Sequence, residues 1–373
     1  MLTFRKALIS AVALITFILF LRSSHSSSDS PAPVATSPEA IAYEISEGAK
    51  QETSGQNGGL GQQQLLKQPA PPATAPLRER LRYHYSYNLE AKFPAYIWQT
   101  WKYTPASVWF KQDLRKPEAS WTEKNPNFVH QVVPDEIVHH LIKYLYGSIP
   151  EVFEAFDSLP LPVLKADFFR YLILLARGGV YSDIDTTALQ PVIDWLPDTL
   201  DLSTVGFVVG IEADPDRPDW NDWYSRRIQF CQWTIQSKPG HPILIDIIAY
   251  ITEETLRMKK AGILKVGKMD KTIVEFTGPA AWTDAVFRYF NDPEYFNIEP
   301  GSTRNITYED FTNQEDYKKV GDVVVLPITS FSPGVQQMGS KDTDDPMAFV
   351  HHEFDGVNLY SHPLAIFTLP RKR

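Results

Sequence analysis

Hydrophobic positions from residue 77 onward follow two periods in turn. The three-to-four-residue spacing of amphipathic helices alternates with short apolar runs that are typical of buried strands. Helices are predicted over residues 135–146, 161–177 and 242–258, and strands over residues 96–100, 128–132, 180–185, 205–211 and 323–327. This alternation favours an α/β layer with a central sheet over an all-helical domain.

The segment from residue 161 to 185 carries the most specific pattern. Its helix is expected to stop at Gly178 and Gly179, and the strand that follows carries Asp183 and Asp185. Side chains alternate along a strand, so both carboxylates would share one face and reach one divalent cation, for which Mg²⁺ or Mn²⁺ is the natural choice. An Asp-x-Asp triplet alone also occurs by chance at solvated turns and strand edges.

The context of the triplet supports the metal interpretation. Asp167 and Arg170 lie three residues apart on the preceding helix and hence share one face. Taken together, the helix, the glycines and the carboxylates resemble the DXD sugar transferases related to the fungal initiation-specific alpha-1,6-mannosyltransferases, glycosyltransferase family 32. Four further segments resemble the same family in the same order: residues 93–102, Trp121 with residues 125–128, residues 277–283 and residues 350–352. Together the matching segments cover roughly residues 93–360.

The resemblance implies a single GT-A-type domain with a mixed, mainly parallel sheet, in which ligands bind at the carboxyl ends of strands. It also implies a retaining enzyme that transfers mannose from GDP-mannose to an N-glycan in alpha-1,6 linkage with Mn²⁺ or Mg²⁺. Asp185 is expected to ligate the metal, and Asp183 to contact the metal or the ribose. Arg170 would contact a phosphate or hold Asp167, which would accept a hydrogen bond from a sugar hydroxyl; a weak surface ion pair is the alternative.

Further site residues have two interpretations each. Adjacent side chains of an extended segment face opposite ways, so at most one of His351 and His352 is expected to reach the metal, and we assign His352. Trp98 and Trp101 are candidates for stacking on the guanine base, with core packing as the alternative. Residues 278–279, a Gly-Pro pair, would shape a loop under the acceptor sugar or start a helix.

The amino-terminal part predicts a membrane anchor and a stem. Residues 1–22 combine a short basic tail with about twenty mostly apolar residues, which favours an uncleaved signal anchor over a cleaved signal peptide. Residues 23–80 are rich in Ser, Pro, Ala, Gln and Gly, a composition typical of a disordered stem. Residues 81–373 would form the luminal domain of a single-pass type II Golgi membrane protein.

Composition excludes some partners. The net charge of -9 and the lack of a dense basic run argue against nucleic acid as a partner.

Two single residues carry further expectations. Cys231 has no cysteine to pair with and is expected to be a buried apolar residue. Asn305 begins the sequon of a glycoprotein. Other mannosyltransferase subunits are possible partners. A sphingolipid acceptor, another nucleotide sugar and a non-catalytic scaffold subunit stay open as alternatives.

Overall fold

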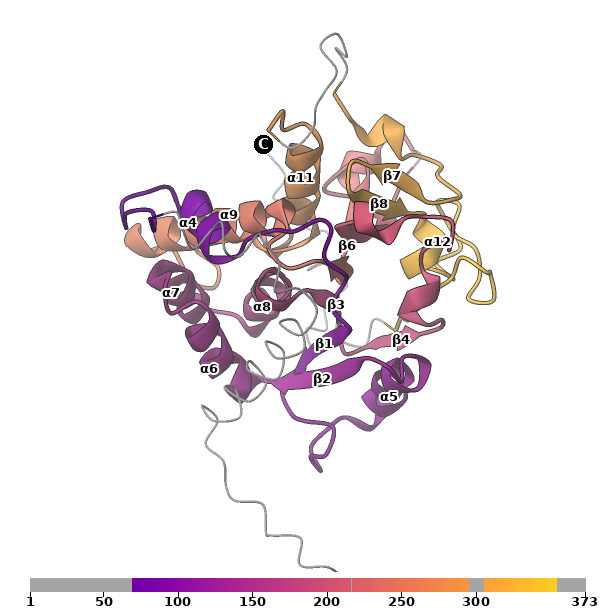
Figure 1. Ribbon diagram of the computed structural model, residues 1–373, viewed down its shortest axis with the longest axis horizontal. Helices are drawn as coiled ribbons and strands as arrows, with labels where there is room; N and C mark the ends of the chain where they lie inside the picture. The colour runs from indigo at the N-terminus through magenta and orange to yellow at the C-terminus, as the bar shows by residue number, and fades with distance from the viewer. Residues whose placement is uncertain (1–68, 216, 295–304, 354–373) are drawn as a thin grey trace, which may run out of the picture. The chain divides into compact units, whose positions relative to one another are not determined.

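The computed structural model describes residues 69–215, 217–294 and 305–353. Their main sheet has seven strands in the order β2-β1-β3-β6-β5-β8-β7 (Figure 1). The bounds are β1 Tyr96–Trp101, β2 Val129–Pro134, β3 Gly179–Ser182, β5 Phe207–Ala213, β6 Gln229–Ser237, β7 Lys318–Val320 and β8 Val323–Leu326. A second sheet pairs β4 (Thr186–Ala188) with β9 (Val350–His352).

The main sheet is mixed and mainly parallel, as the sequence predicts. Strand β1 is parallel to β2 and β3, and β5 is parallel to β8. Strand β6 is antiparallel to both β3 and β5, and β7 is antiparallel to β8. Within the described residues, β6 and β7 therefore run against the other five strands, and the carboxyl ends of β1, β3 and β5 meet at one edge.

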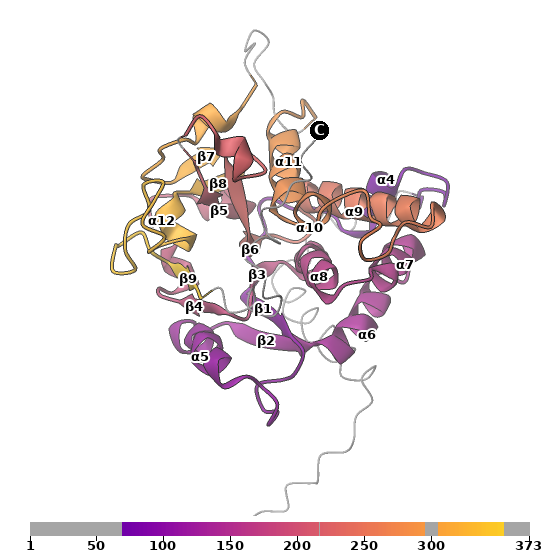
Figure 2. The ribbon, with the colours of Figure 1, turned by 180° about the vertical axis from the view of Figure 1, so that it is seen from behind.

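Helices cover both faces of this sheet (Figure 2). Their bounds are α4 Leu77–His84, α5 Arg115–Lys124, α6 Asp135–Leu145, α7 Pro150–Ser158, α8 Pro162–Arg177, α9 Pro242–Lys260, α10 Ile273–Phe276, α11 Pro279–Phe290 and α12 Ile328–Phe331. The larger core cluster lies between the sheet and the layer of α8, α9 and α11, and a smaller one lies on the other face with α12. Side-chain alternation divides β1 between them, because Trp98 joins the larger cluster and Ile97 the smaller.

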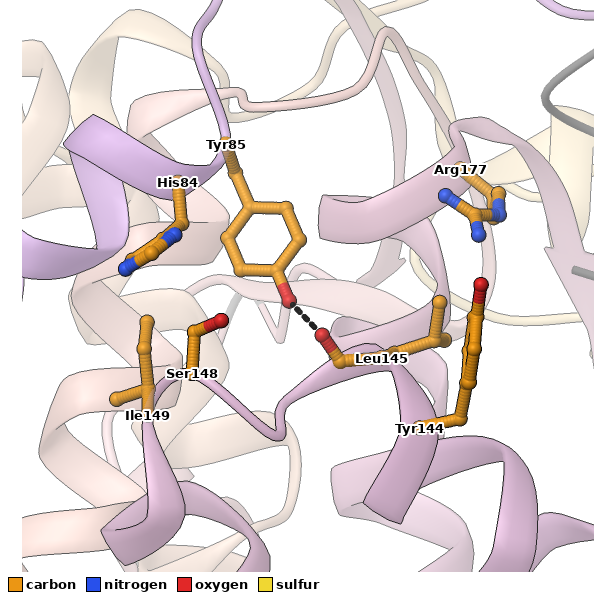
Figure 3. A pocket seen from close by; sticks show the side chains of 7 residues that line it. All are labelled: His84, Tyr85, Tyr144, Leu145, Ser148, Ile149 and Arg177. Atoms are coloured by element: carbon orange, nitrogen blue, oxygen red, sulfur yellow. Dashed lines mark hydrogen bonds between the residues drawn. The ribbon is translucent and has the colours of Figure 1, made fainter.

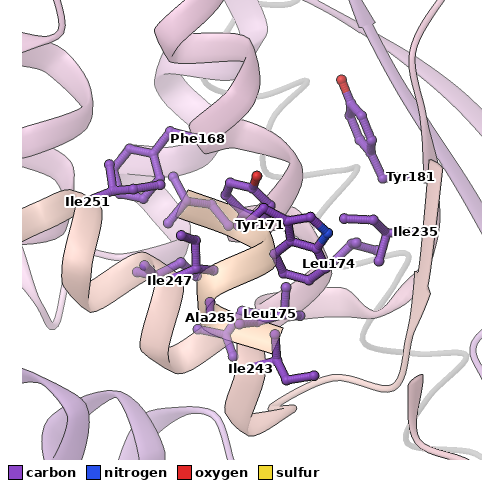
Figure 4. Packing of buried hydrophobic residues seen from close by; sticks show 14 of the residues in the cluster. Phe168, Tyr171, Leu174, Leu175, Tyr181, Ile235, Ile243, Ile247, Ile251 and Ala285 are labelled. Carbon is purple, nitrogen blue, oxygen red and sulfur yellow. The ribbon is translucent and has the colours of Figure 1, made fainter. Parts of the chain in front are cut away.

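Helices α8 and α9 pack through apolar side chains at helical spacing (Figure 4). Phe168 and Tyr171 of α8 and Ile247 and Ile251 of α9 are all fully buried. Gly178, with φ of +66°, then ends α8. Gly179 follows with φ of +91°, and a Cβ there would lie 2.5 Å from the Tyr96 carbonyl oxygen, so β3 can approach β1 only with glycine at this position.

Comparison with the predicted elements shows where sequence reasoning was wrong. The helices predicted at residues 135, 161 and 242 begin within one residue of those positions. The strand predicted over residues 180–185 ends at Ser182, and β6 and α4 were not predicted. Helix α4 begins at Leu77, inside the predicted stem, because Leu77 and Leu81 bury themselves in the core.

The predicted cytosolic tail and membrane anchor at residues 1–22 and stem residues 23–68 lie outside the described residues. Among the residues that are described, no helix combines the length and the apolar character needed to cross a bilayer.

Candidate active site

Asp183 and Asp185 lie in a turn after β3, and not on the strand that the sequence predicted. The strand stops because the Asp183 carbonyl oxygen accepts hydrogen bonds from the Gln99 side-chain amide at 3.0 Å and from the Thr186 hydroxyl at 2.6 Å. The Thr186 backbone N–H also points back to this oxygen, at 3.2 Å, which closes the turn. The residue between the carboxylates, Ile184, is buried. The turn therefore has fixed backbone partners on both sides.

His352 joins the two carboxylates. Strand β9 pairs with β4 so that His352 lies opposite Thr186, directly after the turn. Ligand atoms of Asp183, Asp185 and His352 all lie within 4.8 Å of one another. His351 faces away, with its Nδ1 3.1 Å from a Glu353 carboxylate oxygen. The structure thus brings together the predicted carboxylate pair and one histidine of the two.

This cluster fits a divalent cation by its chemistry. Burial lowers the pKa of His352, which favours the neutral imidazole that a metal requires. Burial raises the pKa of Asp183, and the negative charge of Asp185 raises it further against the opposing effect of Arg170. Two carboxylates and one imidazole are a donor set suited to Mn²⁺. Because the negative charge of Asp185 disfavours the ionised form of Asp183, a cation bound between the two carboxylates would remove that penalty.

Arg170 connects Asp183 to Asp167 in the interior of the protein. Its guanidinium lies 2.9 Å from an Asp183 oxygen and 3.0 Å from an Asp167 oxygen, and the side chains of Arg170 and Asp167 are each 4% exposed. The alternative of a surface ion pair is therefore wrong. The Tyr181 hydroxyl also donates to Asp183 at 2.7 Å. A buried carboxylate without such partners would cost several kcal/mol, roughly 3–5 for a broken pair.

Asp167 is held by two segments that are distant in sequence. The Thr277 hydroxyl donates to one of its oxygens at 2.7 Å and the Gln232 amide to the other at 3.3 Å.

The Gly-Pro pair at residues 278–279 directly follows Thr277. That pair starts helix α11, with Gly278 as its N-cap and Pro279 in its first turn, so the helix-start alternative is confirmed and the loop under an acceptor sugar is not formed there.

The two tryptophans of β1 have different positions. Trp98 is 1% exposed, stacks on Tyr96 and donates its indole N–H to the Gly178 carbonyl oxygen at 2.9 Å. The prediction that Trp98 stacks on a base is therefore wrong, because no face of its ring is accessible. Trp101 is only partly buried, at the carboxyl end of β1, where it packs against a small cluster containing Ile184. It stays a candidate for base stacking.

Strand β6 contributes residues that sequence reasoning missed. Between the pairs Val209–Ile235 and Ile211–Phe230, one residue of β5 faces four residues of β6. Such bulges bend a strand and redirect its side chains, often beside active sites. This bulge contains Gln232 and Trp233, and the Trp233 ring lies 4.7 Å from the His352 ring. The Trp233 carbonyl oxygen also accepts the Asp183 backbone N–H at 2.9 Å.

Glu212 is a further acidic residue near the site, and it was not predicted from the sequence. It lies near the carboxyl end of β5, half-buried, and its carboxylate accepts from the Gln229 amide at 3.1 Å. The sequence held a signal for this residue, because an acidic residue follows an otherwise apolar run there.

Two further residues of the sequence analysis are structural. Trp121 is fully buried and donates to the Thr186 carbonyl oxygen at 3.0 Å. Cys231 is buried and free, as expected.

A separate pocket opens where helices α4, α6 and α8 end (Figure 3). Its lining includes His84, Tyr85, Tyr144 and Arg177, and the Tyr85 hydroxyl donates to the Leu145 carbonyl oxygen at 2.7 Å. Arg177 ends α8 two residues before β3 begins. The pocket therefore lies toward the amino end of β3, whereas the carboxylate turn follows its carboxyl end.

Comparison with known proteins agrees with this geometry. Residues 112–201, which include the turn, match the family described as "Glycosyltransferase sugar-binding region containing DXD motif". The chain is 49% identical to the initiation-specific alpha-1,6-mannosyltransferase of Candida albicans, over 76% of this chain and 77% of the relative. It is 46% identical to the protein of that name in Schizosaccharomyces pombe (74% and 66% covered) and 33% identical to that in Saccharomyces cerevisiae (75% and 81%). The chain therefore belongs to the family of initiation-specific alpha-1,6-mannosyltransferases, glycosyltransferases with a DXD sugar-binding region.

Proposed function

We propose that this protein is a metal-dependent, retaining glycosyltransferase that moves mannose from GDP-mannose to an N-linked glycan and forms an alpha-1,6 bond. The observation that carries the proposal is the cluster of Asp183, Asp185 and His352 at the carboxyl ends of the strands, in a family whose members bear that name. We further propose a GT-A-type fold, for which the mixed sheet and the position of the turn are the support.

The residues divide the chemistry between them. Asp185, Asp183 and His352 would hold Mn²⁺ or Mg²⁺, which supplies charge neutralisation on the leaving diphosphate. Arg170 fixes the Asp183 carboxylate through a buried ion pair, so this ligand needs little reorganisation when the donor binds. Trp101 would stack on the guanine base. In a front-face mechanism the leaving phosphate takes the proton of the acceptor hydroxyl, so the protein needs to supply no nucleophile.

The cellular setting is proposed from the sequence. Residues 1–22 would anchor the protein in the Golgi membrane as a single-pass type II protein, with the catalytic domain in the lumen. Asn305, the sequon residue, is exposed, which is compatible with glycosylation there. We also propose other mannosyltransferase subunits as partners, whereas the negative net charge argues against nucleic acid.

The test is mannosyl transfer by the full chain, purified in detergent, with GDP-mannose, Mn²⁺ and a high-mannose N-glycan. The variant carrying both Asp183→Ala and Asp185→Ala should lose at least about a thousandfold in rate. Equal transfer by wild type and double variant would refute the metal assignment. Transfer to a sphingolipid but not to the glycan would replace the proposed acceptor, and failure to bind any nucleotide sugar would favour a scaffold subunit.

The assignment of the base-binding position has a matched pair of variants. Trp101→Ala should raise the KM for GDP-mannose about tenfold or more, because stacking on a base contributes roughly 1–3 kcal/mol. Trp98→Phe keeps a ring in the core and should leave that KM unchanged, while it lowers the melting temperature through loss of the hydrogen bond to Gly178.

A further inference from the structure

Glu212 is the last residue but one of β5 and lies at the same edge of the sheet as the metal-site turn. Strands β3 and β5 are both neighbours of β6, so their ends lie about two strand spacings, roughly 10 Å, apart. Between them lies the β6 bulge, which carries Gln232 and Trp233. The edge therefore presents, in spatial order, the Asp183 turn, the bulge and Glu212. A sugar attached to a diphosphate at the turn would extend over one of the two neighbouring strands.

The side of β6 and β5 suits a sugar better than the side of β1. Toward β1, the turn is covered by an apolar cluster in which Ile184 packs on Phe110 and Leu114. Toward β5, the side chains are polar: the Gln232 amide bonds Asp167 and Tyr171, and the Glu212 carboxylate accepts from Gln229. A hexose is covered with hydroxyl groups, which lose hydrogen bonds to water when they are buried and need protein partners in exchange.

The Glu212 carboxylate has capacity for such partners. Its hydrogen bond to Gln229 and its interaction with the Trp233 indole involve neutral donors, and an ionised carboxylate accepts at about four positions. Burial raises its pKa to about 7, an effect that the negative charge of Asp183 increases while the Gln229 hydrogen bond and the positive charge of Arg170 oppose it. At neutral pH the ionised form is thus available, and hydroxyl donors would stabilise it further.

We propose that Glu212 accepts hydrogen bonds from hydroxyl groups of the donor sugar and so contributes to the choice of the sugar that is transferred. This inference rests on the proposed function, because it takes the cluster of Asp183, Asp185 and His352 as the site of the diphosphate. Glu212 then discriminates the sugar and contributes nothing to the nucleotide. The two parts of the donor can be separated experimentally, since GDP carries the diphosphate without the sugar.

The experiment measures binding of GDP and of GDP-mannose to the full chain with Mn²⁺ by calorimetry. Glu212→Gln keeps the size of the side chain and removes the charge, and Glu212→Ala removes the group. GDP affinity should stay within twofold of wild type for both variants. GDP-mannose affinity should fall about tenfold for Glu212→Gln and up to about a hundredfold for Glu212→Ala, as expected for hydrogen bonds to a charged group. Glu309→Gln, at an exposed position, is the control and should change neither.

Selectivity provides a second readout. GDP-glucose differs from GDP-mannose in the configuration of one hydroxyl group, and the ratio of the two affinities should move toward one in Glu212→Ala. Unchanged affinity for GDP-mannose, or an equal loss for GDP and GDP-mannose, would overturn the proposal. If the wild type prefers another nucleotide sugar, the assignment of mannose fails separately, and Glu212 is then judged by the same comparison with that donor. If Glu212→Ala does not fold, Glu212→Gln with its melting temperature as a control decides.

Discussion

The replacement of Arg170 by methionine tests whether the ion pairs beneath the site have the energetic weight that their burial implies. Methionine matches the aliphatic part of the arginine side chain as far as Nε and so keeps its packing inside α8, but it loses the guanidinium that lies over the Tyr181 ring at 5.2 Å. What it removes is the positive charge between Asp167 and Asp183. Both carboxylates then lack their cationic partner, while the backbone of helix α8 is unchanged.

The expected cost follows from the exposure of each carboxylate. Asp167 is 4% exposed, so water cannot replace the guanidinium there, whereas the Asp183 side chain is 26% exposed and recovers part of its hydration. Breaking a buried pair typically costs about 3–5 kcal/mol, and the exposure of Asp183 places this case near ~3–4 kcal/mol. A domain stable by about 5–15 kcal/mol would lose a large part of its stability.

The measurement is urea unfolding in EDTA for wild type, Arg170→Met, Asp167→Asn and the variant with both changes. Asp167→Asn removes the most buried negative charge but keeps an oxygen that can accept from Thr277. The double variant should be more stable than the sum of the single losses predicts, by about 2 kcal/mol, since the buried charge and its partner disappear together. Additivity within about 0.5 kcal/mol would refute the reasoning, because it would mean that the two groups do not interact.

Three further predictions follow from single positions. His352→Ala should weaken Mn²⁺ binding by about tenfold or more in calorimetry, whereas His351→Ala should leave it within twofold, because only His352 joins the carboxylates. Gly179→Ala should lower the free energy of unfolding by about 2–3 kcal/mol or more, since φ is +91° and the new Cβ would meet the Tyr96 carbonyl; normal stability would contradict the close approach. Burial raises the pKa of Glu212 from 4.5 to about 7, so the folded state holds this proton more tightly than the unfolded state. Protonation of Glu212 therefore contributes to the free energy of unfolding at low pH, and this contribution is lost as pH rises from about 4.5 to 7. In EDTA, Glu212→Gln should therefore gain stability over wild type by roughly 1–3 kcal/mol across that range, and parallel pH profiles would exclude the effect.

The features that sequence reasoning predicted are local ones. Helix α8 was bounded correctly to within one residue because a proline at its start and Gly178 at its end act over a few residues. The Asp-x-Asp pair and Arg170 were predicted from their spacing together with the order of the surrounding motifs and the family resemblance. Even here the assumed strand was wrong: the carboxylates come together through a turn, whose hydrogen bonds come partly from Gln99, more than eighty residues earlier. The proximity was predicted, and its physical cause was not.

The features that were missed depend on register between distant strands. Nothing in the local sequence of β6 shows that four of its residues face one residue of β5, yet this bulge brings Gln232 to Asp167 and Trp233 to His352. Trp98 was misassigned for a related reason. In the sequence, a tryptophan on a strand looks the same whether its ring faces a ligand or the core. The burial of Trp98 and its hydrogen bond to the Gly178 carbonyl oxygen identify a core position.

The way in which the turn is held also bears on how the site works. Three neighbours fix Asp183 and the residue after it: Gln99 donates to its carbonyl, the Trp233 carbonyl accepts its N–H, and Ile184 is buried on Phe110. A turn with its backbone bonds satisfied and its central side chain buried loses little entropy when a cation and a diphosphate arrive. The cost of bringing two carboxylates close together is thus borne by folding, through the buried Arg170 and its partners, so binding free energy remains for the donor itself.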